Sequence, residues 1–406
     1  MMILVSTMLV MSGQGIIAPV LPLFASEFGA GAASVGLTLS IFALARLLLN
    51  VPLGLLSDRY GRRMLLVGGP VVNALGMIGS GLSPGIGELL AWRFVAGAGS
   101  AMYMTGAQIY LADISAPRDR ARVIGTNQAA LLVGVSIGPG IGGLLADSFG
   151  LRVPFYAVGF GALVAAAYGY LRLPETGPSD PSLQPGAVPA TPHRPWLEMM
   201  RSRDFLAVSA VTASVFLTRA GGRMTLMPLL AASELGYSVA SLGGLFTVMA
   251  MINLVGIAPA AVVADRFGRK WAIVPSGLII GVALVLMAGV KTPSVFLMSA
   301  LLLAVGSSII GPAPAAYAVD LAPRALRGLA MGLYRSAGDL GFTLGPVLLG
   351  LLADNTSIGW ALAANAAIVV GASIFFGLGA RETLPQIDPV PDTKNRDDLE
   401  VRVPRS

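Results

Sequence analysis

The chain has 406 residues, of which 55% are hydrophobic and only 12% are charged. Soluble domains carry about 25% charged residues, so this composition predicts a chain that lies in lipid rather than in water. The absence of cysteine excludes disulfides, thiolate metal sites and cysteine nucleophiles, and the net charge of +6 falls in short clusters between apolar stretches, which argues against nucleic acid as a partner.

Twelve apolar stretches have about the 20 residues that an α-helix needs to cross roughly 30 Å of hydrocarbon. The first has no basic segment before it, so we expect a membrane span there rather than a cleaved signal peptide. The sequence therefore predicts an all-α membrane protein with twelve transmembrane helices. The predicted spans are residues 2–24, 34–56, 64–82, 86–113, 121–145, 154–173, 205–230, 240–263, 271–290, 294–319, 327–352 and 358–380.

The predicted spans form two groups, residues 1–173 and 205–380, joined by a segment rich in proline. This segment, residues 174–204, is predicted to be an extended polar linker, and residues 381–406 to be a disordered tail. If the linker is cytoplasmic, most of the 27 Lys and Arg residues lie on its side, and only Arg152 and Lys291 lie on the other. This bias predicts that both termini, the linker and the tail are cytoplasmic.

An internal repeat relates the two groups at a constant offset of 207 residues. The charged turn at residues 54–63 returns at residues 261–270, with Asp, Arg, Gly and Arg in matching places. The same offset carries Gly138-Pro139 to Gly345-Pro346 and Asp147 to Asp354. Each unit has six predicted spans, an even number, so both copies face the same way. The sequence thus predicts two pseudo-symmetric six-helix bundles about an axis along the membrane normal, as in secondary transporters.

The repeated turns are predicted to form a latch on the cytoplasmic face. Glycine permits the tight reversal, and the arginine after it can pair with a carboxylate at the end of a neighbouring span, Asp113 in one half and Asp320 in the other. Pairs that form in only one conformation make a bistable latch, whereas the alternative is a static anchor. The latch residues are Gly54, Asp58, Arg59, Gly61, Arg62, Arg63, Asp113, Asp265, Arg266, Gly268, Arg269 and Asp320.

These turns resemble the signature loop between spans two and three of the major facilitator superfamily. The fourth predicted span contains Arg93 in a segment similar to the membrane-embedded arginine motif of that family, although Ala96 replaces its usual glutamine. The resemblance covers residues 1–385 and implies the major facilitator fold. The fifth span resembles the antiporter motif of the drug/proton branch, which the family associates with an occluding seam between the halves. The motif residues are Gly125, Gly134, Gly138, Pro139, Gly142 and Gly143.

Small residues at this spacing let another helix approach closely, and Pro139 bends its helix by removing a backbone donor. Ordinary packing between helices is the alternative explanation of the glycine pattern.

One carboxylate, Asp339, is predicted to lie deep within a span, near the middle of the eleventh. A charge at that depth costs at least about 2.5–3.5 kcal/mol, which indicates a function. Arg335 lies one helical turn earlier on the same face and can pair with it. A buried carboxylate with a removable arginine partner is suited to carrying a proton, so Asp339 and Arg335 are predicted to couple transport to protons. A static pair that neutralises itself is the alternative.

Five arginines and one carboxylate within the spans predict a central cavity of net positive charge. Multidrug members of the family often place an acidic residue in the first span, but the polar residue of that span here is Gln14. The charge therefore favours anionic, zwitterionic or neutral amphiphilic substrates over lipophilic cations. Met102 and Met104 could supply an adaptable wall. The residues predicted to line the cavity are Gln14, Arg46, Arg93, Tyr103, Gln108, Asn127, Arg219 and Arg223.

The chain offers no acid/base pair, nucleophile with a base, or metal cluster, so we expect neither an enzyme nor a cofactor or metal. We predict a secondary active transporter, a monomer of the bacterial inner membrane, whose partners are a small-molecule substrate, protons and the lipid bilayer. Efflux of amphiphilic or anionic compounds in exchange for protons is favoured. Proton-coupled uptake of an organic anion or a sugar is the alternative, and a channel or a membrane receptor that does not transport is an alternative of another class.

Overall fold

The computed structural model describes residues 2–115, 120–174, 200–311, 313–322 and 327–383. Within these ranges, side chains are not described at residues 2–5, 51, 54, 55, 58, 59, 112, 120–122, 124, 125, 128 and 327–329. All regular elements in the described part of the chain are helices. Most of the predicted linker and of the predicted tail lies outside the described residues.

The structure describes seven helices in the amino-terminal half. They are α1 (Met2–Ile17), α2 (Leu21–Ser26), α3 (Ala32–Tyr60), α4 (Arg62–Leu82), α5 (Ile86–Ile114), α6 (Arg120–Phe149) and α7 (Val153–Arg172). The predicted first span is divided between α1 and α2. The division follows from Pro19 and Pro22, because proline has no N–H to continue the helical hydrogen bonds.

The described residues of the carboxyl-terminal half form nine elements, and three of them follow one another without a break. These three are α9 (Arg203–Leu217), the π-helix η2 (Thr218–Leu226) and α10 (Met227–Leu235). The others are α11 (Val239–Arg266), α12 (Arg269–Ala288), α13 (Pro293–Ile310), α14 (Ala313–Leu321), α15 (Arg327–Asn355) and α16 (Ile358–Gly379).

Ten helices in the described residues are long and apolar enough to cross a membrane. The two predicted spans missing from this set are the first, which is divided, and the fourth, α5. Polar side chains such as Arg93, Tyr103 and Gln108 interrupt the apolar sequence of α5. Both segments are helical nevertheless, so the helical elements follow the predicted order of twelve spans.

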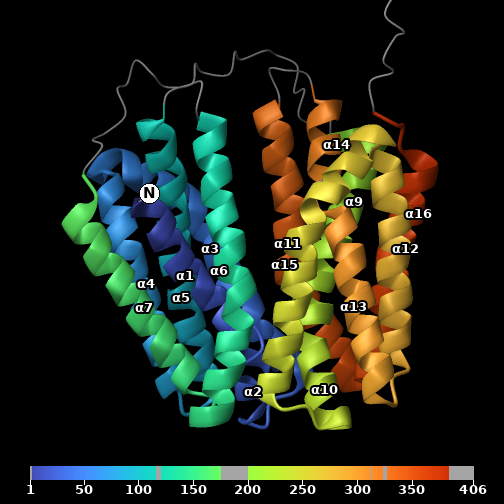
Figure 1. Cartoon of the computed structure of the whole chain (residues 1–406), viewed down its shortest axis with the longest axis horizontal. Coiled ribbons are helices and arrows are strands. Elements are labelled where there is room, and N and C mark those ends of the chain that lie inside the picture. The colour runs from blue at the N-terminus through green and yellow to red at the C-terminus, as the bar shows by residue number, and fades with distance from the viewer. Residues whose placement is uncertain (1, 116–119, 175–199, 312, 323–326, 384–406) are drawn as a thin grey trace, which may run out of the picture.

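The helices pack into two groups that correspond to the two halves of the chain (Figure 1). In the amino-terminal half α4 packs on α5 and α7, and α1 packs on α6. In the carboxyl-terminal half α12 packs on α13 and α16, and α15 packs on α9. Between the halves, α6 packs on α11, α3 packs on α15, and α2 touches α10. Figure 1 shows the halves converging at the end of the molecule that carries α2 and α10.

The repeat of 207 residues is present in the backbone as well as in the sequence. Gly61, between α3 and α4, has a φ of +89°, and its counterpart Gly268, between α11 and α12, has a φ of +112°. Gly29 and Gly236 form a second pair at the same offset, with φ values of +69° and +65°. Only glycine adopts such angles without steric cost, so both turns require the residue that the sequence repeats.

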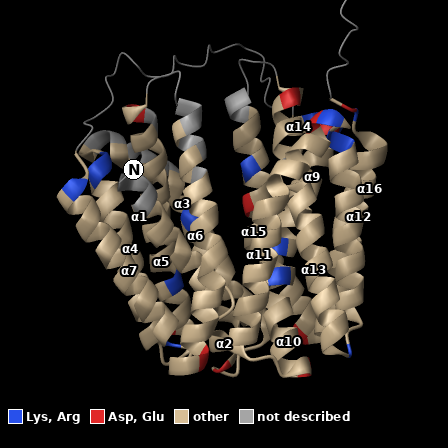
Figure 2. Cartoon of the chain, in the orientation of Figure 1, with Lys and Arg blue, Asp and Glu red and all other residues tan. Residues whose placement is uncertain are grey.

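The two ends of the molecule differ in charge. Basic residues at the starts of α4 and α12, Arg62 with Arg63 and Arg269 with Lys270, lie at one end, which we call the basic end (Figure 2). The opposite end carries α2 and α10 and is called the α2/α10 end. This distribution matches the one that the positions of Lys and Arg in the sequence predict.

Candidate functional site: a charged cavity between two repeats

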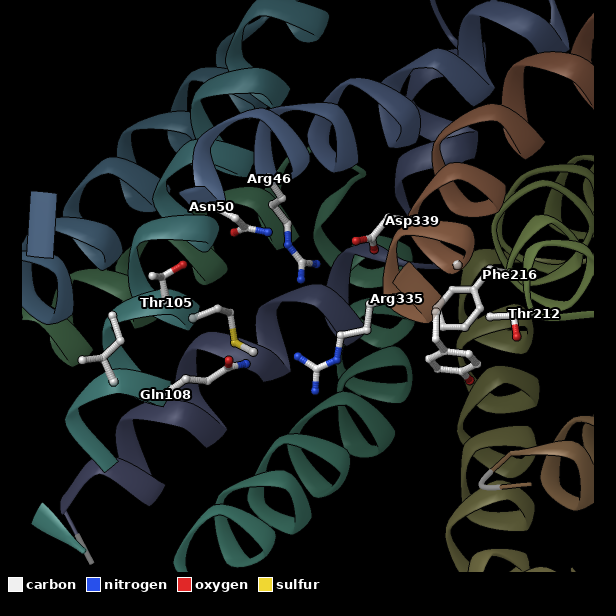
Figure 3. A pocket seen from close by; sticks show the side chains of 12 residues that line it. Arg46, Asn50, Thr105, Gln108, Thr212, Phe216, Arg335 and Asp339 are labelled. Carbon is white, nitrogen blue, oxygen red and sulfur yellow. The ribbon is translucent and has the colours of Figure 1, made fainter. Parts of the chain in front are cut away.

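A cavity of about 590 Å³ lies between the two halves (Figure 3). Four helices contribute its walls, α3 and α5 from the amino-terminal half and α9 and α15 from the carboxyl-terminal half. Both repeats therefore share one site. The lining residues are Arg46, Asn50, Met104, Thr105, Gln108, Ile109, Thr212, Phe216, Tyr334, Arg335, Gly338 and Asp339.

Asp339 is the one described carboxylate that lines this cavity, and its side chain is exposed there. The arginine that acts most strongly on Asp339 is Arg46, which belongs to the other half, and Arg335 acts less strongly. Figure 3 shows the Arg335 guanidinium turned away from Asp339, and no ion pair joins these two described residues. Both arginines therefore act on Asp339, and the stronger of the two interactions joins the two halves.

Three residues predicted to line the cavity are instead packed among the amino-terminal helices. Arg93 is only 3% exposed, and its guanidinium lies 4.6 Å above the ring of Phe42. Tyr103 and Asn127 are buried and share Thr7, whose hydroxyl lies 2.9 Å from the Tyr103 hydroxyl and donates a 2.8 Å hydrogen bond to Asn127 Oδ1. None of these three residues lines the cavity, because each side chain packs against neighbouring helices of its own half.

The other predicted lining residues divide between the cavity and its surroundings. Arg46 and Gln108 line it, as does Met104. Gln14 lies on α1, where its Nε2 donates to Ser100 Oγ at 3.4 Å. Arg219 and Arg223 lie on η2, beyond the residues that line the cavity.

Sequence reasoning missed seven of the twelve lining residues, although helical spacing contained the signal. Asn50 follows Arg46 by four residues on α3, and Tyr334 lies one turn before Gly338 on α15. Residues four apart share a helix face, so each face could have been extended from its charged member. Thr105 and Ile109 of α5 and Thr212 and Phe216 of α9 have the same spacing.

The glycine motif of α6 packs against two different helices. A Cβ atom placed on Gly138 would lie 2.6 Å from Ser12 O of α1, and one on Gly142 would lie 2.0 Å from Ile16 O. Gly134 makes the same kind of approach to α1, at 2.8 Å from Met8 O. Only glycine allows this separation of the two backbones. The side chain of the sixth motif residue, Gly125, is outside the described residues.

The remaining motif residues contact the opposite half. A Cβ on Gly243 of α11 would lie 2.5 Å from Pro139 O, and one on Gly143 would lie 2.7 Å from Val239 O. We call this contact of α6 with α11 the first seam. An occluding seam between the halves was expected from this motif, and its role in transport remains a prediction.

A second seam repeats the first at the offset of 207 residues. A Cβ on Gly36 of α3 would lie 2.3 Å from Pro346 O of α15, and one on Gly350 would lie 2.5 Å from Ala33 Cα. Gly36 corresponds to Gly243, and Gly350 to Gly143. The two halves therefore meet through a pair of pseudo-symmetric glycine contacts.

One contact in the second seam has no counterpart in the first. The backbone N–H groups of Ala32 and Ala33, at the start of α3, donate to the two carboxylate oxygens of Asp354, at 2.6 Å and 2.9 Å. The unpaired N–H groups at a helix start carry partial positive charge, so an anion there is stabilising. Asp354 also lines a smaller cavity of about 460 Å³ at the α2/α10 end. This end is thus closed by direct contacts between the halves.

The ion pairs predicted for the latch are present at the basic end. Arg62 Nε lies 2.9 Å from Asp113 Oδ2, with the arginine side chain 1% exposed. Arg269 Nε lies 3.3 Å from Asp320 Oδ2, and Asp265 contacts the same arginine. Both pairs join helices of one half, so these contacts do not connect the halves in this conformation. Their role as a bistable latch remains a prediction.

The other predicted latch residues give no further evidence for ion pairs of this kind. Arg63 donates to the backbone oxygen of Tyr170 within the amino-terminal half. Arg266 is exposed, with its guanidinium 5.9 Å from the Phe267 ring. The side chains of Gly54, Asp58 and Arg59 lie outside the described residues.

Two repeated helical groups around a shared charged cavity, joined at one end by matched seams, have the arrangement of transporters that are built from internal repeats. The model of the Major Facilitator Superfamily matches residues 3–222 and again residues 212–401. The chain therefore belongs to the major facilitator superfamily, whose members are transporters and not enzymes.

Individual relatives agree with this assignment. The chain is 29% identical to an uncharacterized MFS-type transporter of Methanocaldococcus jannaschii, over 90% of this chain and 95% of that protein. It is 26% identical to Multidrug resistance protein 1 of Bacillus subtilis, over 84% of this chain and 86% of that protein. Its fold matches the crystal structure of a bacterial homologue of the human lysosomal transporter Spinster, in an inward-facing and unoccupied conformation. That match has a TM-score of 0.75 and 17% identity, and covers 93% of this chain and 94% of the other.

Proposed function

We propose that this protein exports small amphiphilic or anionic organic compounds in exchange for protons, by alternating access of the central cavity to the two sides of the membrane. The observation that carries the proposal is the placement of Asp339. It is the one described carboxylate on the cavity wall, it belongs to one half, and the charge that acts on it most strongly, Arg46, belongs to the other.

This arrangement links the protonation of Asp339 to the separation of the halves. An ionised Asp339 attracts Arg46 and draws α15 toward α3, while a protonated Asp339 does not. Because the two arginines of the cavity outnumber its carboxylate, the cavity keeps a net positive charge that attracts an anionic substrate. Protonation of Asp339 increases that positive charge, so the charges alone would favour movement of an anion together with protons; the preference for exchange rests on the antiporter-type glycines of α6 and on the similarity to a protein named for multidrug resistance.

The orientation and the direction of transport are part of the proposal. We place the basic end in the cytoplasm, because cytoplasmic loops of membrane proteins carry an excess of Lys and Arg. The conformation described here, with its contacts between the halves at the α2/α10 end, is then inward-facing. The antiporter-type glycines of α6 support efflux, as does the similarity to a protein named for multidrug resistance. We propose a monomer in a bacterial plasma membrane.

Purified protein in liposomes tests the coupling. A pH gradient that drives protons into the liposomes is applied. The uptake or release of a labelled organic anion is then measured for the wild-type protein and for Asp339→Asn. We expect gradient-driven transport to fall to the rate seen without a gradient in Asp339→Asn, while exchange of substrate at equal pH continues. Asp147→Asn, an exposed carboxylate at the end of α6, is the matched control and should behave as wild type.

Gradient-driven transport at the wild-type rate in Asp339→Asn would refute the role of this carboxylate. Movement of substrate in the same direction as protons would instead support the alternative, proton-coupled uptake.

A further inference from the structure

Two arginines continue the cavity-lining face of one helix toward the closed end of the molecule. Thr212 and Phe216 of α9 line the cavity, and Arg219 and Arg223 of η2 follow without a break in the helix. These four positions are separated by four, three and four residues, a spacing that places side chains on one side of a helix. Arg219 and Arg223 therefore lie one and two turns beyond the wall of the cavity.

The contacts of η2 with neighbouring helices show which way its different sides face. Gly221 packs on α15, where a Cβ would lie 2.7 Å from Gly345 O, and Gly222 packs against Asn365 of α16 at 2.5 Å. The Arg223 guanidinium lies instead 5.7 Å from the ring of Phe246, on α11. Helices α11 and α15 both contact the amino-terminal half, and η2 itself touches α3. Arg223 thus lies on the side of η2 that faces α11, and Arg219 lies four residues earlier on the same helix.

Neither arginine has an acidic partner among the described residues. The described ion pairs all lie at the basic end, and the only charge that acts appreciably on Arg223 is the repulsive charge of Arg219. Arg223 Nε is buried and makes no hydrogen bond, while Arg219 is exposed. Two guanidinium groups that repel each other within a membrane protein need an anion that the protein itself does not supply.

The local backbone is also unusual at this point. Residues 218–226 form a π-helix, with the Thr225 hydroxyl donating to Ala220 O at 2.9 Å. Such segments are rare and occur frequently at functional sites.

From these observations we infer that Arg219 and Arg223 form the subsite that holds the acid group of the substrate. The ligand is an organic monoanion whose carboxylate binds both guanidinium groups and whose flat apolar body extends into the cavity along Phe216. This inference rests on the proposed transport function and gives it a substrate class. Arg46 and Arg335 then serve Asp339, while the pair on η2 selects the substrate.

The subsite explains a choice among substrates of the same shape. Guanidinium groups recognise a carboxylate through paired, charge-assisted hydrogen bonds, and they repel an ammonium group. Among an acid, an alcohol and an amine that share one ring system, the acid should therefore bind most tightly and the amine most weakly. The apolar body contributes equally in the three cases.

Equilibrium binding to the full chain in a nonionic detergent tests the inference. The probes are 2-naphthoate, 2-naphthalenemethanol and 2-naphthylmethylammonium. We expect the wild type to bind the acid most tightly. Arg219→Gln and Arg223→Gln should each weaken acid binding by about tenfold, and the double variant by about 100-fold, because each removes charge-assisted hydrogen bonds. Binding of the alcohol should change by less than about twofold.

Two further variants separate the subsite from general effects of charge and folding. Arg203→Gln removes the same charge from the exposed start of α9 and should bind the acid as wild type does. Arg223→Lys keeps the charge and should retain acid binding more fully than Arg223→Gln. Unchanged alcohol binding shows that each variant is folded.

The inference is overturned if the double variant binds the acid as tightly as wild type, if the amine binds as well as the acid, or if wild type binds none of the three probes. Because this measurement uses no pH gradient, it is independent of proton coupling. The liposome assay of Asp339→Asn leaves Arg219 and Arg223 unchanged, so failure of one proposal is distinguishable from failure of the other.

Discussion

Asp354 is predicted to hold the α2/α10 end closed. Its carboxylate accepts two hydrogen bonds from the start of α3, at 2.6 Å and 2.9 Å, and so joins the last turns of α15 to the opposite half. This contact exists only while the halves meet at this end. Any free energy that it contributes therefore stabilises the closed end relative to the open one.

The size of the contribution follows from two known effects. Capping a helix start with a carboxylate is worth about 0.5–2 kcal/mol, and the charge alone about 0.3–1 kcal/mol at an exposed position such as this one. We therefore expect Asp354→Ala to cost the closed end about 1–2 kcal/mol, and Asp354→Asn about half of that, because an amide keeps one acceptor. A change of 1.4 kcal/mol shifts a two-state equilibrium about tenfold.

Distances between spin labels across the α2/α10 end measure this shift. The chain has no cysteine, so Gly87→Cys on α5 and Ser294→Cys on α13 give two unique labelling sites. We expect Asp354→Ala to increase the population with long distances about five- to thirtyfold.

Asp147 provides the matched control, since it occupies the position 207 residues earlier at the end of α6. The helix that it would approach, α11, is already capped by its own Ser238, which accepts from Ser241 N at 3.2 Å. Asp147→Ala should therefore leave the distances unchanged. An unchanged distance distribution in Asp354→Ala, or an equal shift in both variants, would contradict the reasoning.

Three other substitutions test the seams and the turns. Gly143→Leu inserts a side chain into the first seam, where a Cβ would already lie 2.7 Å from a carbonyl oxygen of α11. It should destabilise the closed conformation by about 1–3 kcal/mol, which the same spin-label distances report. Gly161→Leu, at a position with open space around its Cβ, is the control. Arg62→Gln should lower the free energy of unfolding in detergent by about 2 kcal/mol, because this ion pair is largely buried. Arg269→Gln should lower it by less than about 1 kcal/mol, because the partners of Arg269 are more exposed. Equal losses would argue against burial as the cause. Gly61→Ala should lower thermal stability by about 1–2 kcal/mol, because its φ is +89°, and an unchanged melting temperature would count against that strain.

The sequence predicted most of the fold because lipid imposes strict requirements on a chain. Apolar segments must be long enough to span the bilayer, and charges must gather between them. The turn at Gly61 and its copy at Gly268 were predictable from the repeat. The π-helix at residues 218–226 was not predicted, because hydropathy does not distinguish a π-turn from an α-turn.

The charged groups of the site were also predictable, but their partners were not. Asp339 was identified by its depth in a span, and it does line the cavity. Spacing along α15 suggested Arg335 as its partner, whereas Arg46 of the other half acts on it more strongly. Spacing within a helix describes neighbours on that helix alone, while the cavity is formed by helices from both repeats.

Residues on helices that are apolar on every side were the hardest to place. Tyr103 and Gln108 are separated by five residues on α5, yet Tyr103 is buried beside Thr7 and Gln108 lines the cavity. In a soluble helix the polar face identifies the side away from the core. In a membrane bundle, polar side chains face either the cavity or a neighbouring helix, and the sequence does not separate the two.

The claim that the halves move against each other at their seams can be tested most directly with one reversible cross-link. Gly140 of α6 and Thr247 of α11 face each other across the first seam, where a Cβ on Gly140 would lie 3.9 Å from Thr247 Cβ, within the range for a disulfide. In the double variant Gly140→Cys/Thr247→Cys, oxidation should stop gradient-driven transport in liposomes, and reduction should restore it. Transport at the full rate while the cross-link is intact would contradict the account.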